Sequence, residues 1–222
     1  MSALAFFLLG IPAAFAVERL IFRFSRPVGD LEDESLATKR LPWQAEPWPA
    51  RVRLALAMLT PPLMAIAGWR FEAVAALAVT PLILAMLICT GTDLLRYRVP
   101  NAVTYPGTLL ALLAAVLMPD ADLVSALLAA LLGGGLFLLL AVVSRGGIGL
   151  GDVKLAVLIG AALGLPGAYQ ALFIGMAVAG AVLVLLLVGG IVGRRQAVPY
   201  APFLALSAVG FVLLNGAAFA PL

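Results

Sequence analysis

Long apolar segments separated by short polar clusters dominate this chain and restrict what it can fold into. A helix needs about 20 apolar residues to cross a bilayer. With 64% hydrophobic residues, 11% charged residues and a mean hydropathy of +1.14, a soluble domain is excluded. The alternating pattern of membrane barrel strands is absent. The sequence predicts an all-α, polytopic transmembrane bundle in one domain, residues 1–222, with about eight spans at 3–17, 53–68, 72–90, 103–118, 122–143, 153–167, 171–192 and 201–219.

The basic residues test this count, because cytosolic loops carry an excess of Lys and Arg. With eight spans, 13 of the 14 basic residues flank loops on one side, and Arg70, beside Glu72, is the exception. We therefore expect a multi-pass protein of the inner membrane with both termini outside. The largest cytosolic loop is residues 24–50, with a short amphipathic piece at 31–41. Ala14-Phe15-Ala16 resembles a signal-peptidase site, but the charges follow the apolar run, which favours a retained first helix.

Residue types that are missing exclude several kinds of chemistry. The chain has no His and a single cysteine, Cys89, so a His-ligated zinc site, a paired-cysteine metal site and Ser-His or Cys-His catalysis are excluded. The basic residues lie at helix ends, which is typical of membrane topology and not of a nucleic-acid surface. We predict no cofactor, no metal and no nucleic-acid partner.

Two carboxylates, Asp93 and Asp152, fall at the same predicted membrane face, one at the end of a span and the other at the start of another. Two ionised carboxylates about 4 Å apart repel by roughly 4 kcal/mol at an effective dielectric of 20, so a close pair shares one proton. Such a dyad supplies a base for water and an acid for a carbonyl oxygen. The alternative is two interfacial ion pairs, Asp93 with Arg96 or Arg98 and Asp152 with Lys154.

The sequence motifs around the two aspartates resemble those of the type IV prepilin peptidases, a family of membrane aspartic proteases. Asp93 precedes Val99-Pro100-Asn101 by six residues, and Asp152 lies in Gly149-Leu150-Gly151-Asp152-Val153-Lys154-Leu155. A Gly-x-Gly-Asp alone is also similar to the presenilin type, which lacks the Val-Pro-Asn partner. A weaker likeness is Val198 to Leu206, which is similar to the family's Pro-Phe-Gly-Pro-Phe-Leu segment but has Tyr200-Ala201 in its middle. In the first helix, Glu18 stands where the family usually has Asn.

The resemblance implies an endopeptidase that removes a short basic leader from prepilin-like proteins at the cytosolic face. It assigns Asp93 and Asp152 as catalytic. Five residues are assigned supporting roles. Gly149 and Gly151 allow close packing, and Pro100 and Asn101 shape the turn after Asp93. Lys154 either steadies the Asp152 carboxylate or anchors the helix end. Asn101 is also a candidate cap of the next helix. The family's four-cysteine zinc module is absent from the first loop, and methylation of the product is doubtful.

Two other functions stay open at this point. One is a small carrier that uses both aspartates as a proton relay, although its expected mid-span charges and two-fold internal repeat are absent. The other is an inactive subunit of a pilus assembly. The glycine pairs Gly160 with Gly164 and Gly189 with Gly193, together with residues 133–135, predict ordinary close packing between membrane helices.

Overall fold

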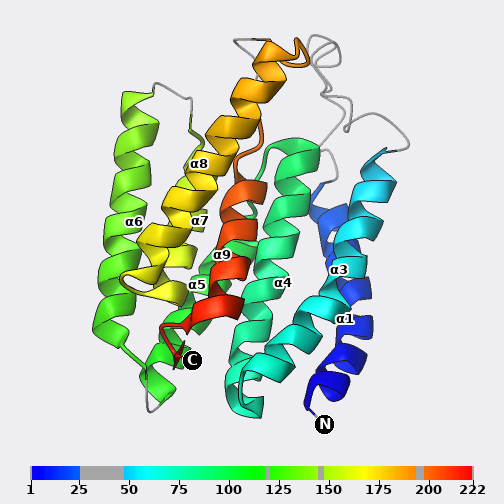
Figure 1. The fold of residues 1–222 in the computed structure, drawn as a ribbon, viewed down its shortest axis with the longest axis vertical. Helices are drawn as coiled ribbons and strands as arrows, with labels where there is room; N and C mark the ends of the chain where they lie inside the picture. The colour runs from blue at the N-terminus through cyan, green and yellow to red at the C-terminus, as the bar shows by residue number, and fades with distance from the viewer. Residues whose placement is uncertain (1, 26–47, 119–120, 145–147, 194–197, 222) are drawn as a thin grey trace.

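The computed structural model describes residues 2–25, 48–118, 121–144, 148–193 and 198–221, and it is an all-α membrane-type bundle (Figure 1). Neighbouring helices run alternately up and down, and both termini lie at the same end, the lower one in Figure 1. The described helices are α1 Ser2–Phe24, α3 Trp48–Arg70, α4 Ala73–Arg96, α5 Asn101–Leu117, α6 Leu123–Val143, α7 Leu150–Leu163, α8 Gly167–Val188 and α9 Ala201–Asn215.

Five helices are long and apolar enough to cross a membrane, namely α1, α3, α4, α6 and α8. The other three are shorter: α5 has 17 residues, α7 has 14 and α9 has 15. At 1.5 Å per residue these measure about 20–26 Å, against a hydrocarbon core of about 30 Å. The predicted all-α bundle is therefore confirmed, whereas eight full spans are not.

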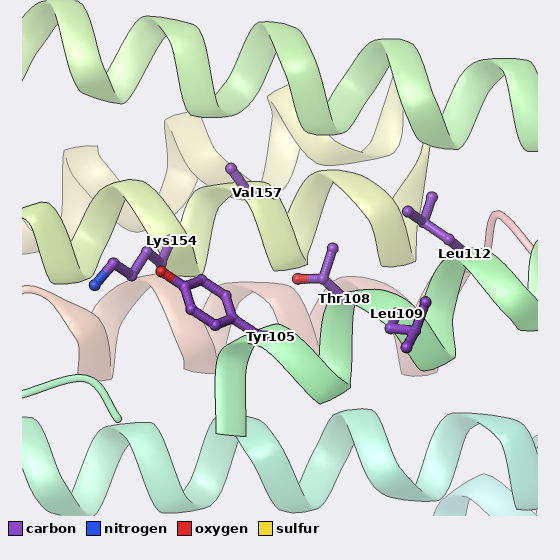
Figure 2. Close-up of a pocket in the computed structure, with 6 residues that line it drawn as sticks. All are labelled: Tyr105, Thr108, Leu109, Leu112, Lys154 and Val157. Atoms are coloured by element: carbon purple, nitrogen blue, oxygen red, sulfur yellow. The ribbon is translucent and has the colours of Figure 1, made fainter. Parts of the chain in front are cut away.

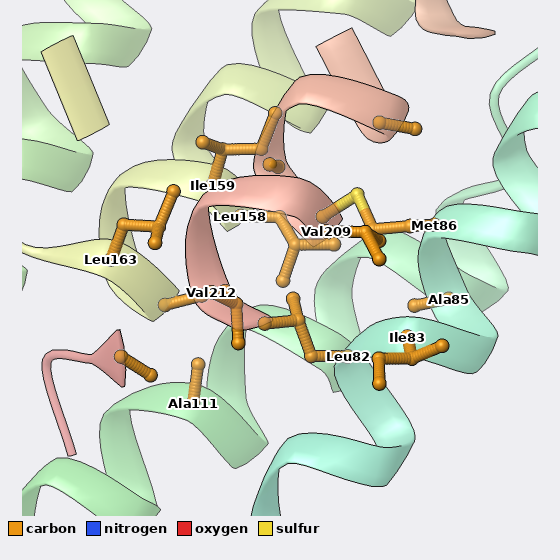
Figure 3. Packing of buried hydrophobic residues seen from close by; sticks show 14 of the residues in the cluster. Leu82, Ile83, Ala85, Met86, Ala111, Leu158, Ile159, Leu163, Val209 and Val212 are labelled. Atoms are coloured by element: carbon orange, nitrogen blue, oxygen red, sulfur yellow. The ribbon is translucent and has the colours of Figure 1, made fainter. Parts of the chain in front are cut away.

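The core lies where α4, α7 and α9 meet (Figure 3). Ile83 and Met86 of α4, Leu158 of α7 and Val212 of α9 are almost completely buried there. α5 packs against α7 on one flank, α6 also packs on α7, and α1 pairs with α3 on the other flank. The two helices that carry the candidate aspartates, α4 and α7, thus both pack against the central helix α9.

Glycine allows a close contact between the backbones of α6 and α7. A Cβ on Gly160 would overlap the Ala129 carbonyl oxygen and lie 2.5 Å from Ala130 Cα. Its predicted partner Gly164 instead ends α7, with a φ of 63° that favours glycine. The second predicted pair is wrong as a packing motif, because α8 stops at Val188 and Gly189 caps it, so neither Gly189 nor Gly193 lies within a helix.

Helix ends differ from the predicted ones where polar groups find partners. The first helix continues beyond residue 17 to Phe24, because Glu18 pairs with Arg53 of α3 at 3.1 Å and Arg53 lies 4.9 Å from the centre of the Phe22 ring. The third predicted span continues from residue 90 to Arg96. The predicted loop at 24–50 and its piece at 31–41 lie almost wholly outside the described residues.

The last helix ends earlier than predicted, at Asn215 instead of 219. A two-stranded antiparallel ribbon follows, β1 Gly216–Ala217 with β2 Ala220–Pro221. The turn between the strands is anchored, since the Ala218 N–H donates to the Ala162 carbonyl at 2.8 Å. Arg70, the exception to the charge pattern, donates from Nε and Nη2 to the carbonyls of Leu213 and Leu214 at 3.0 and 2.9 Å. It therefore caps the last turn of α9.

Candidate active site

Asp93 lies in the last turn of α4 and is only 6% exposed. The helix ends just after it, at Tyr97, which has a left-handed backbone and donates its N–H to the Asp93 carbonyl at 2.8 Å. The Asp93 side chain accepts through Oδ2 from the N–H of Ala201, the first residue of α9, at 3.0 Å. The unpaired amides at a helix N-terminus favour a carboxylate, so α9 holds Asp93 in place.

Asp152 is the third residue of α7 and is 8% exposed. Its Oδ2 accepts from the N–H of Gly149, the residue that caps the same helix, at 3.2 Å. This is the carboxylate half of a capping box, in which the third helical residue reaches back to the capping amide. Each of the two buried aspartates therefore accepts a hydrogen bond from a backbone amide at a helix N-terminus.

The two motifs around these aspartates come together at one end of the bundle. Gly151 packs against Val99, and a Cβ on Gly151 would lie 3.0 Å from Val99 Cγ2 and 3.1 Å from Val99 Cβ. The absence of a side chain at residue 151 thus lets the turn before Asp152 approach the turn after Asp93.

A side-chain bond makes a second link between the motifs. Lys154 Nζ donates to Asn101 Oδ1 at 2.7 Å, joining α7 to the start of α5. Pro100 is the residue that caps α5, with extended backbone and no side-chain cap bond, so the expected capping role of Asn101 is not observed. Asn101 instead binds Lys154, and the other expected partner of Lys154, the Asp152 carboxylate, accepts from Gly149.

Residues 81–185, from within α4 into α8, match the model of the type IV leader peptidase family. The chain is similar to that family over this region, which is a little under half of its length. Searches of curated proteins and of solved structures gave no match. The match supports the resemblance seen in the motifs. The five long apolar helices are those of a multi-pass membrane protein.

Contacts among the described residues do not support the ion-pair alternative. Lys154 donates to Asn101, Arg96 Nε donates to the Ser25 carbonyl at 2.9 Å, and each aspartate accepts from a backbone amide. In the same part of the chain there is no group of three Asp, Glu, Cys or His side chains that could hold a metal ion.

The sequence patterns did not predict the amide that binds Asp93. The signal was the weaker third motif, in which Ala201 and Pro202 begin α9. Ala201 stands where the family has Gly, but any residue other than proline supplies the same N–H. Pro202 lies in the first turn of α9, where a backbone N–H has no hydrogen-bond partner within the helix. The N–H that proline lacks is therefore not missed there. Of the glycine run before Asp152, residues 146 and 147 lie outside the described residues.

Proposed function

We propose that this chain is an aspartic endopeptidase that removes the basic leader from type IV prepilin-like precursors at the cytosolic membrane face. The observation that carries the proposal is the pair of buried carboxylates, Asp93 and Asp152, each bound by a helix N-terminal amide at the same end of the bundle. Burying two acids is costly, and perturbed carboxylates in a membrane protein are typical of functional sites. The family match supports the peptidase class.

The proposed chemistry needs one protonated and one ionised aspartate. Close carboxylates cannot both ionise, so the pair retains one proton near neutral pH. The ionised member takes a proton from water, and the water oxygen attacks the carbonyl carbon of the scissile bond. The protonated member gives its proton to the carbonyl oxygen, which yields a neutral tetrahedral diol. Collapse of the diol breaks the C–N bond, with a proton passing to the departing amine.

The backbone amides prepare the carboxylates for this task. The N–H of Ala201 and the N–H of Gly149 each engage Oδ2, which fixes the orientation of both side chains. We assign the other oxygen of each carboxylate to water and substrate. A precursor whose apolar helix stands in the bilayer presents its leader junction at the depth of helix ends, which is where both aspartates lie. Positioning of this kind can supply several kcal/mol of the barrier.

Cleavage of a prepilin-like substrate in liposomes by wild type, Asp93→Asn and Asp152→Asn tests this function. Asn is nearly isosteric and keeps an oxygen for the helix amide, so each variant should fold while cleavage falls to background. Glu72→Gln is the matched control, since Glu72 is an exposed carboxylate that caps α4 without a side-chain bond. It should cleave like wild type.

Cleavage by either folded aspartate variant would remove the two-carboxylate mechanism. A wild type that folds but never cleaves would favour the inactive assembly subunit. Proton uptake that depends on both aspartates, without cleavage, would favour the carrier.

A further inference from the structure

A groove between α5 and α7 is separate from the paired aspartates. It has a volume of about 280 Å³ and is lined by Tyr105, Thr108, Leu109 and Leu112 of α5 and by Lys154 and Val157 of α7. In Figure 2, Lys154 and Tyr105 lie at one end and Leu109 and Leu112 at the other. Residues two apart on a helix point in nearly opposite directions, so Lys154 faces the groove while Asp152 faces the core.

The groove opens to the outside of the bundle. Tyr105 is 58% exposed and Leu109 is 67% exposed, on a helix whose outer face is apolar. In a membrane protein this face meets lipid chains. The cation lies at the end where both α5 and α7 begin, which is the end that carries the two aspartates.

Lys154 keeps its charge available for a ligand. Its ammonium donates to the neutral Asn101 amide at 2.7 Å and lies 5.8 Å from the centre of the Tyr105 ring. Among the residues that the structure describes, no carboxylate pairs with it. A positive charge at one end of an apolar groove is complementary to a molecule with an anionic head and an apolar tail.

The volume of the groove, together with the charge at its end, favours a lipid chain over a second helix. A helix about 10 Å wide that rises 1.5 Å per residue occupies about 120 Å³ per residue, so the groove would hold only two or three residues of a second helix. A methylene has about the size of a water molecule, near 30 Å³, so the groove holds about nine methylenes of one acyl chain.

We propose that the α5–α7 groove binds an anionic phospholipid, with the phosphate at Lys154 and one acyl chain along Leu109, Leu112 and Val157. The lipid would lie against the face of α7 opposite Asp152. The site would thus give the protein a preference among membrane lipids that does not depend on peptidase activity.

Native mass spectrometry of the detergent-solubilised protein, with dioleoyl phosphatidylglycerol or dioleoyl phosphatidylcholine added, tests the proposal. Wild type should retain the phosphatidylglycerol preferentially. Lys154→Gln should weaken that retention about fivefold, the contribution of one basic residue near an anionic membrane surface, whereas Lys154→Arg should keep most of it. Arg23→Gln is the control, because Arg23 is an exposed basic residue at the end of α1 and outside the groove.

Filling the groove gives a second, independent test. Leu109→Trp should displace the acyl chain and reduce retention of phosphatidylglycerol, while Leu113→Trp, on the same helix but outside the groove, should not. Equal retention by wild type and both groove variants, or equal loss in the controls, would overturn the proposal. Loss of leader cleavage in Leu109→Trp with unchanged lipid retention would assign the groove to the substrate helix instead.

Discussion

Gly160→Ala should destabilise the bundle strongly, because the added methyl has no room. Its Cβ would overlap the Ala129 carbonyl oxygen and lie 2.5 Å from Ala130 Cα, and both atoms belong to the backbone of α6. Ordinary carbon contacts are about 3.5–4.0 Å, so α6 and α7 would have to separate by about 1 Å. Overpacking of this kind typically costs 1–3 kcal/mol, and backbone atoms on the opposing side place it at the upper end. We expect a loss of about 3 kcal/mol, which is a factor of more than 100 in the unfolding equilibrium.

Reversible unfolding in mixed detergent micelles, followed by circular dichroism, measures this change. Gly135→Ala is the matched control, since Gly135 lies on α6 and a Cβ there would meet nothing within 4 Å. That control should be neutral or stabilised by up to about 1 kcal/mol, because alanine is the better helix former. Equal stabilities for the two variants would show that the α6–α7 approach does not constrain the fold, and the packing argument for Gly160 would be wrong.

Two smaller perturbations test the site and the far end of the bundle. Gly151→Ala should lower kcat about tenfold with little change in KM, because the added Cβ must push Val99 away by a few tenths of an ångström. Adding Val99→Ala to the same chain should restore part of the rate. A double variant no faster than Gly151→Ala alone would contradict the contact. Arg70→Gln should lower the free energy of unfolding by about 1 kcal/mol, since two carbonyls at the end of α9 lose a charged donor; an unchanged midpoint in the same micelle assay would show that the cap contributes nothing.

The sequence predicted the helices better than their ends. Hydrophobic segments and charge alternation were sufficient for a membrane bundle, because the bilayer leaves the backbone few alternatives. The end of α1 was missed because its charge, Glu18, is satisfied by Arg53 more than 30 residues away, a contact that no local pattern reports. The strand pair after Asn215 was missed because it is held by tertiary bonds, such as that from Ala218 to Ala162.

For the candidate site, the motifs predicted which residues would gather but not how they are held. Asp93 and Asp152 were singled out because a carboxylate among apolar residues is conspicuous. Their partners, the amides of Ala201 and Gly149, are backbone groups that every residue except proline carries, so no letter in the sequence identifies them. The bond between Lys154 and Asn101 also joins separate motifs, and spacing along the chain alone predicts no such pairing.

The short helices around the two aspartates affect how water, which peptide hydrolysis consumes, reaches the candidate active site. The 14 residues of α7 extend about 21 Å, which is roughly two thirds of the hydrocarbon thickness. A bundle with such a helix near its centre must either thin the surrounding bilayer or leave the start of that helix below the headgroups in a hydrated recess. In both cases the short length of α7 brings its first turn, which holds Asp152, close to the water that hydrolysis requires.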